Sequence, residues 1–401
     1  MKITSVDVFV LNFGTRDWRP IVCRVNTDEG ISGFGEASVG FDAGAPAAFE
    51  MIGDISYYII GMDAMAHEAV WDKLYKSTFW AQGGGTIIFA AMSAIDTALW
   101  DIKAKALGVP LYKLLGGKCF SDGGKAAPFN KDGLRCYASQ LQFGWGAGMG
   151  KADTDEKLIA ACRKALEEGY DAIKINFITY DDHGGRTGFI RGPIPKETSK
   201  MIERRVSKVR DAIGEDVDLI VENHARTDAT STEEMAKIIE PYGIMFMEEV
   251  ATPLYPDTMA LIRSRINIPL AGGERVYSRW GFEPLFDKNA IQIAQPDIGT
   301  CGGISEAKKI CDAAHTHDVG VQIHVCGSPI SIAASLHMEA SIPNFVIHEH
   351  HVINRWQANI DMGIVDYAPI NGRIQIPEVP GIGQELSEKA MRDALFSCTF
   401  K

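Results

Sequence analysis

Apolar and polar residues follow two different patterns along this chain of 401 residues. In the first part, residues 3–11, 20–26 and 31–37 have the pattern of strands joined by turns, and residues 91–106 repeat apolar side chains with the period of a helix. From about residue 134 onward, short apolar runs alternate with amphipathic helical stretches. We expect strands at residues 134–137, 172–177, 219–222, 244–248, 269–272, 291–295, 319–323 and 345–348.

The second pattern predicts the fold class. Strands that alternate with helices at this spacing form parallel βαβ units, and eight of them favour a closed barrel. A doubly wound open sheet is the alternative, but no glycine-rich dinucleotide-binding sequence follows any strand. We therefore expect an α/β protein with an α+β capping domain at residues 1–130, a (β/α)8-type barrel that holds the active site at 131–360, and a C-terminal segment, 361–401, that packs on the capping domain.

Acidic residues end three consecutive strands of the predicted barrel. Glu222, Glu248 and Glu274 follow one another at intervals of 26 positions, so they are expected on neighbouring strands at one height, at the end of the barrel where active sites lie. Three converging carboxylates repel each other and are costly to desolvate, so a divalent cation is the natural compensation. An all-oxygen ligand set favours Mg²⁺ over Zn²⁺, and we predict one Mg²⁺ per subunit. The alternative is that each glutamate pairs with a Lys or Arg at the barrel rim.

Groups that can move protons end other strands. Asp297 and His324 follow the sixth and seventh strands, so the carboxylate can orient the imidazole and raise its basicity. Taken alone, His324 is more often a hydrogen-bonded core histidine. His224 lies two residues after Glu222, and the strand period of two places both side chains inside the barrel. These residues predict an acid and a base near the metal.

The second and eighth strands also end in polar residues. Lys174 and Asn176 lie two positions apart and are expected to face the lumen together. Glu349 ends the eighth strand between His348 and His350, and we expect these two histidines at a solvated barrel rim. A buried Glu349 would have to be protonated to donate a hydrogen bond to a substrate carboxylate, as burial favours.

Composition and loops narrow the class of partner. A net charge of −12 without basic clusters argues against nucleic acid, and no apolar run of about 18 residues predicts a membrane span. The N-terminus lacks the features of a signal peptide, and the eight cysteines show no CxxC spacing, so we expect a cytoplasmic protein with reduced thiols. Two long loops, 140–153 and 179–195, are expected to be either lids that set specificity or plain surface insertions.

Several motifs together resemble the enolase superfamily and its mandelate racemase subgroup. The segment AIDTALWDIKAKALGVPLYKLLGG is similar to a helix of the capping domain, and FMEE, PLAGGE, QPDIGTCGGISEA and IH follow in the order of the barrel. The likeness covers nearly the whole chain and is strongest to acid-sugar dehydratases of the galactonate type. Those carry Lys-x-Asn, Asp-x-His-x-Arg, a His-Asp dyad and a Glu on strand eight. This sequence has Lys174-Ile175-Asn176, Glu222-Asn223-His224-Ala225-Arg226, Asp297 with His324, and Glu349.

The resemblance implies a modified (β/α)7β barrel and a Mg²⁺-dependent dehydratase of a sugar acid, an aldonate or aldarate. In that reaction His324 removes the C2 proton, His224 protonates the departing 3-hydroxyl, and the product is a 2-keto-3-deoxy sugar acid. Lys174 is expected to bind the substrate carboxylate. Further substrate contacts are assigned to Asn176, Arg226, Trp18 and His183, and family members suggest a homo-oligomer.

The sequence departs from the family pattern and leaves other reactions open. The first metal ligand is usually Asp and here is Glu222, and the His-Glu-His-His run after strand eight differs from the galactonate type. A racemase or epimerase needs a second base, which related racemases supply as a Lys where this chain has Asn176. A cycloisomerase can use the same histidine base, and a catalytically inactive ligand-binding relative is the alternative outside enzymes.

Overall fold

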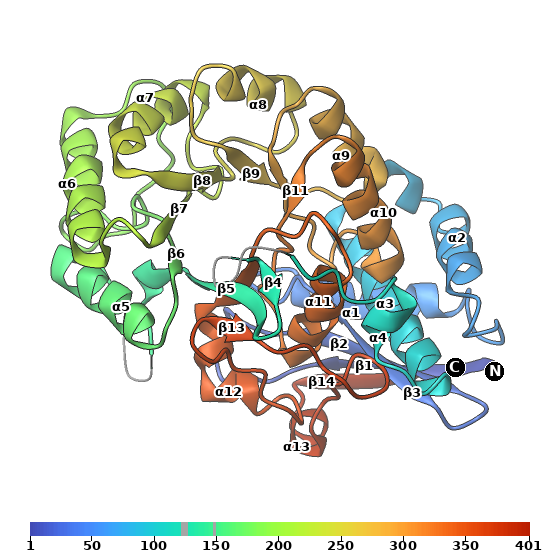
Figure 1. The fold of residues 1–401 in the computed structure, drawn as a ribbon. Coiled ribbons are helices and arrows are strands. Elements are labelled where there is room, and N and C mark those ends of the chain that lie inside the picture. Colours follow the sequence, from blue (N-terminus) through green and yellow to red (C-terminus); the bar gives the residue numbers. More distant parts are fainter. Residues whose placement is uncertain (122–126, 147–149) are drawn as a thin grey trace.

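The computed structural model describes residues 1–121, 127–146 and 150–401 (Figure 1). The N-terminal unit contains an antiparallel sheet whose fourth strand comes from the other end of the chain. Its strands are β1 (Ile3–Val10), β2 (Ile21–Thr27), β3 (Ser32–Ala37) and β14 (Phe396–Phe400), in the order β14-β1-β2-β3. Its helices are α1 (Ala45–Ser56), α2 (His67–Ser77), α3 (Thr86–Ala106) and α4 (Leu111–Leu114).

Helix α3 packs unusually close to β3 because two glycines on the strand have no side chain. A Cβ atom at Gly33 would lie 2.1 Å from the carbonyl oxygen of Ala98, and one at Gly35 would lie 2.0 Å from that of Ala94. The small residues on both elements therefore let the backbones touch. This contact fixes β3, whose last residues reach toward the barrel.

The second unit alternates strands and helices as the sequence pattern predicts. Its strands are β5 (Gly133–Ser139), β6 (Ala172–Ile175), β7 (Asp218–Glu222), β8 (Ile244–Glu248), β9 (Leu270–Gly272), β10 (Ile293–Ala294), β11 (Gly320–Val321) and β12 (His348–His351). Its helices are α5 (Asp155–Glu167), α6 (Lys196–Ile213), α7 (Ala229–Ile239), α8 (Pro256–Arg263), α9 (Ser278–Asp287), α10 (Gly303–Thr316) and α11 (Pro329–Ala340). The short elements β4 (Phe129–Asn130), β13 (Arg373–Ile374), α12 (Gln357–Ile360) and α13 (Glu388–Arg392) flank them.

The strands of this unit form one curled parallel sheet. Their order is β11-β10-β9-β8-β7-β6-β5-β12, and the two ends of the sheet meet through a parallel bridge between Val321 and Phe345. Figure 1 shows helices α5 to α10 around the outside of the sheet, as in a (β/α) barrel. The predicted fold class is confirmed. The eighth strand begins at His348, three residues later than expected, and Phe345 before it pairs with Val321 as an isolated bridge.

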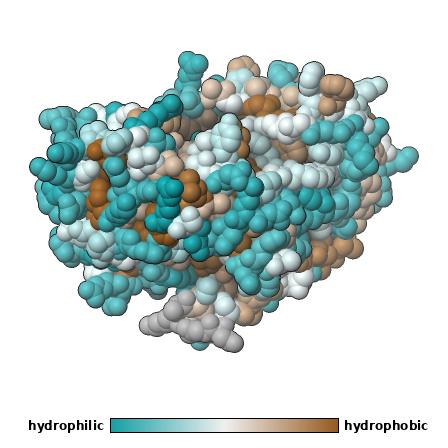
Figure 2. Space-filling view, turned by 90° about the horizontal axis from the view of Figure 1, so that it is seen from above, coloured by the Kyte–Doolittle hydropathy of each residue, from teal (hydrophilic) through white to brown (hydrophobic). Residues whose placement is uncertain are grey.

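Polar residues dominate the molecular surface that Figure 2 shows, and apolar residues appear there in small separated patches. Among the described residues, no helix is long and apolar enough to cross a membrane. All eight cysteines are free thiols, as expected.

Candidate active site

The site is a layer of polar side chains in the barrel lumen, two residues further along the strands than a layer of apolar side chains. Side chains two positions apart face the same side of a strand, so both layers face the lumen. The apolar layer is a buried cluster that closes the barrel from below and includes Ala172, Ile220, Phe246 and Ile347. Two positions later, the same strands carry Lys174, Glu222, Glu248 and Glu349.

Lys174 is at the centre of the polar layer. Its Nζ lies 2.6 Å from Glu248 Oε1, 3.0 Å from Glu349 Oε1 and 3.3 Å from Glu222 Oε2, and no side chain of the four is more than 1% exposed. Burial disfavours the charged amine, but the carboxylates outweigh burial and hold the pKa of Lys174 well above its ordinary value. Lys174 is thus a buried cation, and binding a substrate carboxylate would require it to exchange one of these partners. That role stays a prediction.

Glu349 is ionised, unlike the protonated form expected from its burial. Burial raises its pKa, but the charges of Lys174 and His324 outweigh that effect and hold the pKa well below the usual range. Ser139 Oγ donates to Glu349 Oε1 at 2.6 Å, and the backbone N–H of Val325 donates to Oε2 at 3.1 Å. Glu349 therefore holds Lys174 in place and has no proton to donate to a substrate.

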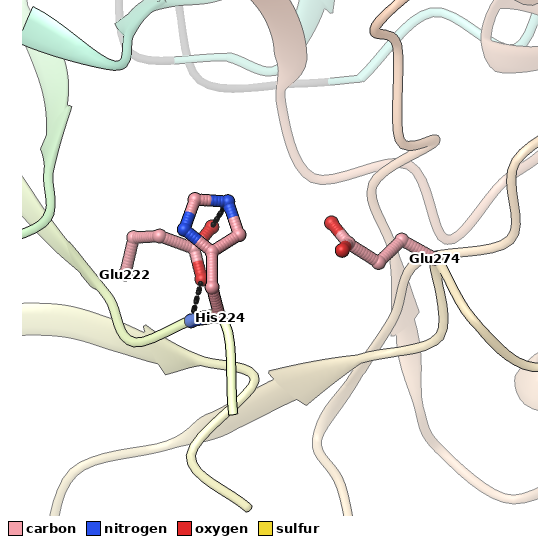
Figure 3. A group of neighbouring side chains, drawn as sticks. All are labelled: Glu222, His224 and Glu274. Carbon is pink, nitrogen blue, oxygen red and sulfur yellow. Dashed lines mark hydrogen bonds and ion pairs between the residues drawn. The ribbon is translucent and has the colours of Figure 1, made fainter. Parts of the chain in front are cut away.

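Glu222, His224 and Glu274 form the group that could hold a metal ion. Their ligand atoms all lie within 4.8 Å of one another, and Figure 3 shows the Glu274 carboxylate directed toward the other two side chains. Glu222 Oε1 accepts a hydrogen bond from the backbone N–H of His224 at 2.7 Å. Glu222 Oε2 is buried and accepts no hydrogen bond from any described residue. Its ion-pair contacts are with Lys174 Nζ at 3.3 Å and with His224 Nε2 at 3.7 Å. A buried carboxylate oxygen that accepts no hydrogen bond is a suitable ligand for a divalent cation.

Glu248, the third predicted metal ligand, lies outside this group. Its Oε1 faces Lys174, and its Oε2 accepts a hydrogen bond from Gln295 Nε2 at 2.7 Å. Burial and the neighbouring charge of Glu222 raise the pKa of Glu248 well above its ordinary value. Both oxygens are occupied by protein groups, so its role as a ligand stays a prediction.

His324 and Asp297 form the expected dyad. His324 Nδ1 lies 2.7 Å from Asp297 Oδ2, and His324 Nε2 lies 3.2 Å from Glu274 Oε2. The other oxygen, Asp297 Oδ1, accepts the backbone N–H of Gly299 at 2.7 Å, which fixes the carboxylate plane. Burial lowers the pKa of His324, but Glu274 and Asp297 outweigh burial and raise the pKa well above its ordinary value. The dyad therefore holds a proton readily and directs Nε2 toward the predicted metal site.

His224 lies on the other side of the carboxylates, and its pKa is shifted in the opposite direction to that of His324. Its Nδ1 is 3.3 Å from Asn176 Nδ2, and its Nε2 is 3.4 Å from Gln140 Nε2. Burial lowers the pKa of His224 to about 4. With substrate and ion absent, His324 is thus the charged histidine and His224 the neutral one at pH 7.

The four predicted substrate contacts are spread over different places. Asn176 is buried beside His224 and faces the polar layer. Arg226 donates from Nη1 to the carbonyl oxygen of Thr187 at 2.8 Å, and so ties the loop after β7 to the loop 179–195. Trp18 is 4% exposed and packs edge-on against Phe13, which leaves little of its surface for a ligand. His183 is exposed on the second long loop.

The two long loops contact each other. Lys151 Nζ donates to the carbonyl oxygen of Gly184 at 3.0 Å and lies over the ring of Tyr180, and Arg186 lies over the rings of Tyr180 and Phe143. Residues 147–149 of the first loop lie outside the described part of the chain. These contacts join the loops into one structural unit, and its role as a cover of the barrel mouth stays a prediction.

Deleting residues 182–184 should change substrate preference without unfolding the barrel. Tyr180 and Arg186 pair across the turn, so the deletion leaves Asp181-Gly185, a favoured two-residue hairpin turn. We expect KM to rise and the order of preference among sugar acids to change. Tm should fall by less than about 4 °C, because the deletion removes the ion pairs of the half-exposed Asp182 with Arg204 and Arg205 and the hydrogen bond from Lys151 to Gly184. Steady-state kinetics and thermal unfolding measure both. Unchanged kinetics on the best substrate would identify the loop as a surface insertion.

The sequence predicts that the two histidines flanking Glu349 lie at a solvated rim, and this prediction is wrong. His348 is completely buried, with Nδ1 2.7 Å from Glu339 Oε2, and His350 is 4% exposed and stacks on Tyr170. Both side chains point outward from β12, toward the covering elements. The barrel wall there is covered by protein, so a position on the outer face of the strand is as dry as the core.

His351 is a residue of the site that the sequence reading missed. It pairs in register with Ser139 and lies two positions after Glu349, so it faces the lumen. The charges of Glu349 and Lys174 act on it, and burial lowers its pKa to about 3. Its Nδ1 accepts the backbone N–H of Ile353 at 3.2 Å, which leaves Nε2 as a hydrogen-bond donor. The strand period of two, counted from Glu349, would have identified it.

Two family models match the chain. Residues 3–116 match the N-terminal domain of mandelate racemase and muconate lactonizing enzyme, and residues 157–390 match the enolase C-terminal domain-like family. The two matches coincide with the antiparallel unit and with the greater part of the barrel.

Relatives extend over the whole chain. A D-galactonate dehydratase from Ralstonia pickettii is 30% identical over 397 residues, which are 97% of this chain and 93% of that protein. A member of the enolase superfamily from Salmonella Typhimurium superimposes with a TM-score of 0.94 at 49% identity, with 100% of both chains covered. The 3,6-anhydro-D-galactonate cycloisomerase from Zobellia galactanivorans has a TM-score of 0.81 at 25% identity, over 99% of this chain and 100% of that chain. The chain therefore belongs to the enolase superfamily, as its motifs predict.

Proposed function

We propose that this protein is a dehydratase of an aldonic or aldaric acid. It removes the proton from C2, eliminates the hydroxyl group from C3, and releases a 2-keto-3-deoxy sugar acid. The observation that carries this proposal is the placement of two histidines on opposite sides of the acidic cluster that contains Glu222 and Glu274. His324, paired with Asp297, lies 3.2 Å from Glu274, and His224 lies 3.7 Å from Glu222. The dehydratase named above, 30% identical over nearly the full length, supports the same class of reaction.

One Mg²⁺ per subunit is part of the proposal, with Glu222, Glu248 and Glu274 as its ligands. When bound, the ion would stabilise the negative charge that develops on the substrate carboxylate as the C2 proton leaves. Three carboxylates and one Mg²⁺ carry a net charge of −1, so an anionic substrate needs a further cation. Lys174 is the buried cation next to two of these carboxylates.

The chain's own groups supply the proton transfers. Asp297 accepts the Nδ1–H of His324, so the neutral ring presents the lone pair of Nε2 to the C2 proton. His224 then gives a proton to the C3 hydroxyl as that group departs, and the resulting enol tautomerises to the ketone. Glu349 keeps Lys174 oriented toward the reacting carboxylate, and Asn176 contacts the ring of His224.

A panel of aldonic and aldaric acids tests the proposal. We expect a 2-keto product from at least one acid, complete loss of turnover with EDTA, and recovery with Mg²⁺. Independently of turnover, saturating Mg²⁺ should raise the stability of the protein by about 2.7 kcal/mol at 100 times its Kd, because it binds only the folded state. The variant Glu274→Gln should lose both effects.

Four results would count against this assignment. Turnover that survives chelation, or an absent Mg²⁺ effect on unfolding, would exclude the metal. A ring-opened isomer without loss of water would identify a cycloisomerase, the activity in the name of the Zobellia relative. Epimerised acid without keto product would identify a racemase or epimerase, although the amide of Asn176 cannot take a proton and so cannot act as the second base.

A further inference from the structure

Two buried carboxylates of the N-terminal unit accept hydrogen bonds from the barrel. Glu36, at the end of β3, is 3% exposed, and its Oε2 accepts the Ser328 hydroxyl at 2.6 Å and the Ser328 backbone N–H at 2.9 Å. Asp96, on α3, is 2% exposed, and it accepts the Ser305 backbone N–H at 2.8 Å and the Ser305 hydroxyl at 2.6 Å. The two contacts use the same chemistry at two neighbouring helices.

Both serines stand at helix N-termini in the barrel. Ser328 is the N-cap of α11, and Ser305 lies in the first turn of α10. The first N–H groups of a helix lack partners within the helix and favour a negative charge nearby. The N-terminal unit therefore supplies one acidic cap to each helix, across the boundary between the units.

These two helices are the ones that follow the strands of the dyad. Asp297 lies between β10 and α10, and His324 lies between β11 and α11. A continuous set of hydrogen bonds connects the dyad to the N-terminal unit, because Asp297 Oδ1 accepts from Gly299 N–H at 2.7 Å and the Gly299 carbonyl accepts from Ser38 N–H at 3.0 Å. Ser38 is two residues from Glu36 on the same strand end.

The loop before α10 is fitted to the same surface. The backbone N–H of Gly302 donates to Ser93 Oγ at 2.9 Å. A Cβ atom at Gly303 would lie 2.4 Å from Asp96 Oδ2, and one at Gly299 would lie 2.0 Å from Ser38 Oγ. The loop that carries Asp297 thus has no room to shift toward the N-terminal unit, and hydrogen bonds prevent it from moving away.

We propose that Glu36 and Asp96 are positioning residues, through which the N-terminal unit holds Asp297 and His324 in the geometry needed for proton abstraction. Neither carboxylate touches the reacting atoms. Each acts through the loop that it caps, and a loss of either cap lets the Nδ1 contact of 2.7 Å lengthen. The role in proton abstraction rests on the proposed function, whereas the effect on the dyad itself does not.

The first test needs no substrate. In protein with ¹⁵N-labelled histidine, the Nδ1–H of His324 should give a downfield proton resonance, assigned by its loss in His324→Asn. We expect this resonance to shift upfield and exchange faster with water in Glu36→Gln and Asp96→Asn. The matched control is Asp101→Asn, which removes a buried carboxylate of the same helix that accepts the backbone N–H of Phe34 and Ile382 but contacts neither dyad loop among the described residues. An unchanged resonance in both cap variants, or an equal change in the control, would overturn the proposal.

The second test uses turnover. We expect Glu36→Gln and Asp96→Asn to lower kcat about ten- to a hundredfold with little change in KM, because misplacement of a catalytic group by about 1 Å has an effect of that size. In an Asp297→Asn background the same changes should add little, since the group they position is already absent. Additive losses would indicate a merely structural role. If the wild type dehydrates no sugar acid, the proposed function fails while the resonance test still decides the positioning role.

Milder variants guard against misfolding. Ser328→Ala and Ser305→Ala remove the hydroxyl donors at 2.6 Å and keep the carboxylates bonded to backbone N–H groups. They also remove the hydroxyl oxygens that accept the Ile330 N–H and the Trp100 Nε1–H. They should move the His324 resonance in the same direction by a smaller amount. No movement in either serine variant, with the cap variants unfolded, would also contradict the proposal.

Discussion

Replacing His324 by Asn should stop both dehydration and the exchange of the C2 proton with D₂O. General base catalysis contributes about 10²–10⁴-fold to a rate, so the loss should be at least of that order. The reason is geometric: of the two histidines proposed for proton transfer, His324 is the one with a carboxylate 2.7 Å from its Nδ1, that of Asp297, and its Nε2 lies 3.2 Å from Glu274 Oε2. Deuterium incorporation followed by mass spectrometry and formation of the keto acid measure the two steps separately.

Replacing His224 by Asn should have a different result, with dehydration lost and exchange retained. Among the described residues, no acidic side chain lies closer to the His224 ring than Glu222, at 3.7 Å, so His224 is suited to release a proton rather than to take one from carbon. Burial lowers the pKa of His224 to about 4, so its charged form releases a proton more readily than an ordinary imidazolium. The surface variant His317→Asn serves as control and should retain both steps, because His317 lies on the outer side of the barrel against Asp287.

The protonation states make this pair of variants decisive. At pH 7 and without ligands, His324 is charged and His224 is neutral, whereas the proposed reaction begins with the opposite distribution. The carboxylates of Glu274 and Asp297 keep His324 charged, so a cation shared with Glu274 would reduce that effect. If His224→Asn abolishes exchange while His324→Asn retains it, the two roles are reversed. Normal dehydration by both variants would exclude either histidine as acid or base.

The strand ends were predictable because barrel geometry depends on a simple period. The matching intervals between Glu222, Glu248 and Glu274 place them on β7, β8 and the end of β9, and the period of two places Lys174 above an apolar residue of the lumen. The contact between Asp297 and His324 follows from adjacent strand ends. The prediction of a barrel over an open sheet is also confirmed, since the two ends of the sheet meet through the bridge between Val321 and Phe345.

The rest depends on contacts between elements far apart in the chain. The sequence shows that Glu349 is acidic, but only the fold shows that Lys174 neutralises it. His348 and His350 are polar residues for which the sequence predicts contact with solvent, yet helices and loops cover that side of β12. Glu36 and Asp96 are separated from their serine partners by more than 200 residues, so no local pattern predicts those bonds.

Replacing Lys174 by Met should cost both activity and stability. Without the ammonium group, Glu222, Glu248 and Glu349 remain as three buried carboxylates with no cation, and removing one partner of a buried ion pair typically costs about 3–5 kcal/mol. Turnover should fall by at least about 10²-fold, because the charge that develops on the substrate carboxylate loses the cation that the protein itself supplies beside the proposed Mg²⁺. Urea unfolding at a fixed pH and steady-state kinetics measure the two effects.

A second change separates these two consequences of Lys174→Met. The double variant Lys174→Met/Glu349→Gln removes one of the uncompensated charges, so it should regain part of the lost stability. It should not regain turnover, because the missing cation is what the substrate requires. Added Mg²⁺ should likewise stabilise the single variant more than the wild type, since it would offset a larger excess of negative charge. Near-normal turnover of Lys174→Met would show that the site compensates the substrate's charge in another way, and unchanged stability would show that the three carboxylates take up protons when Lys174 is lost.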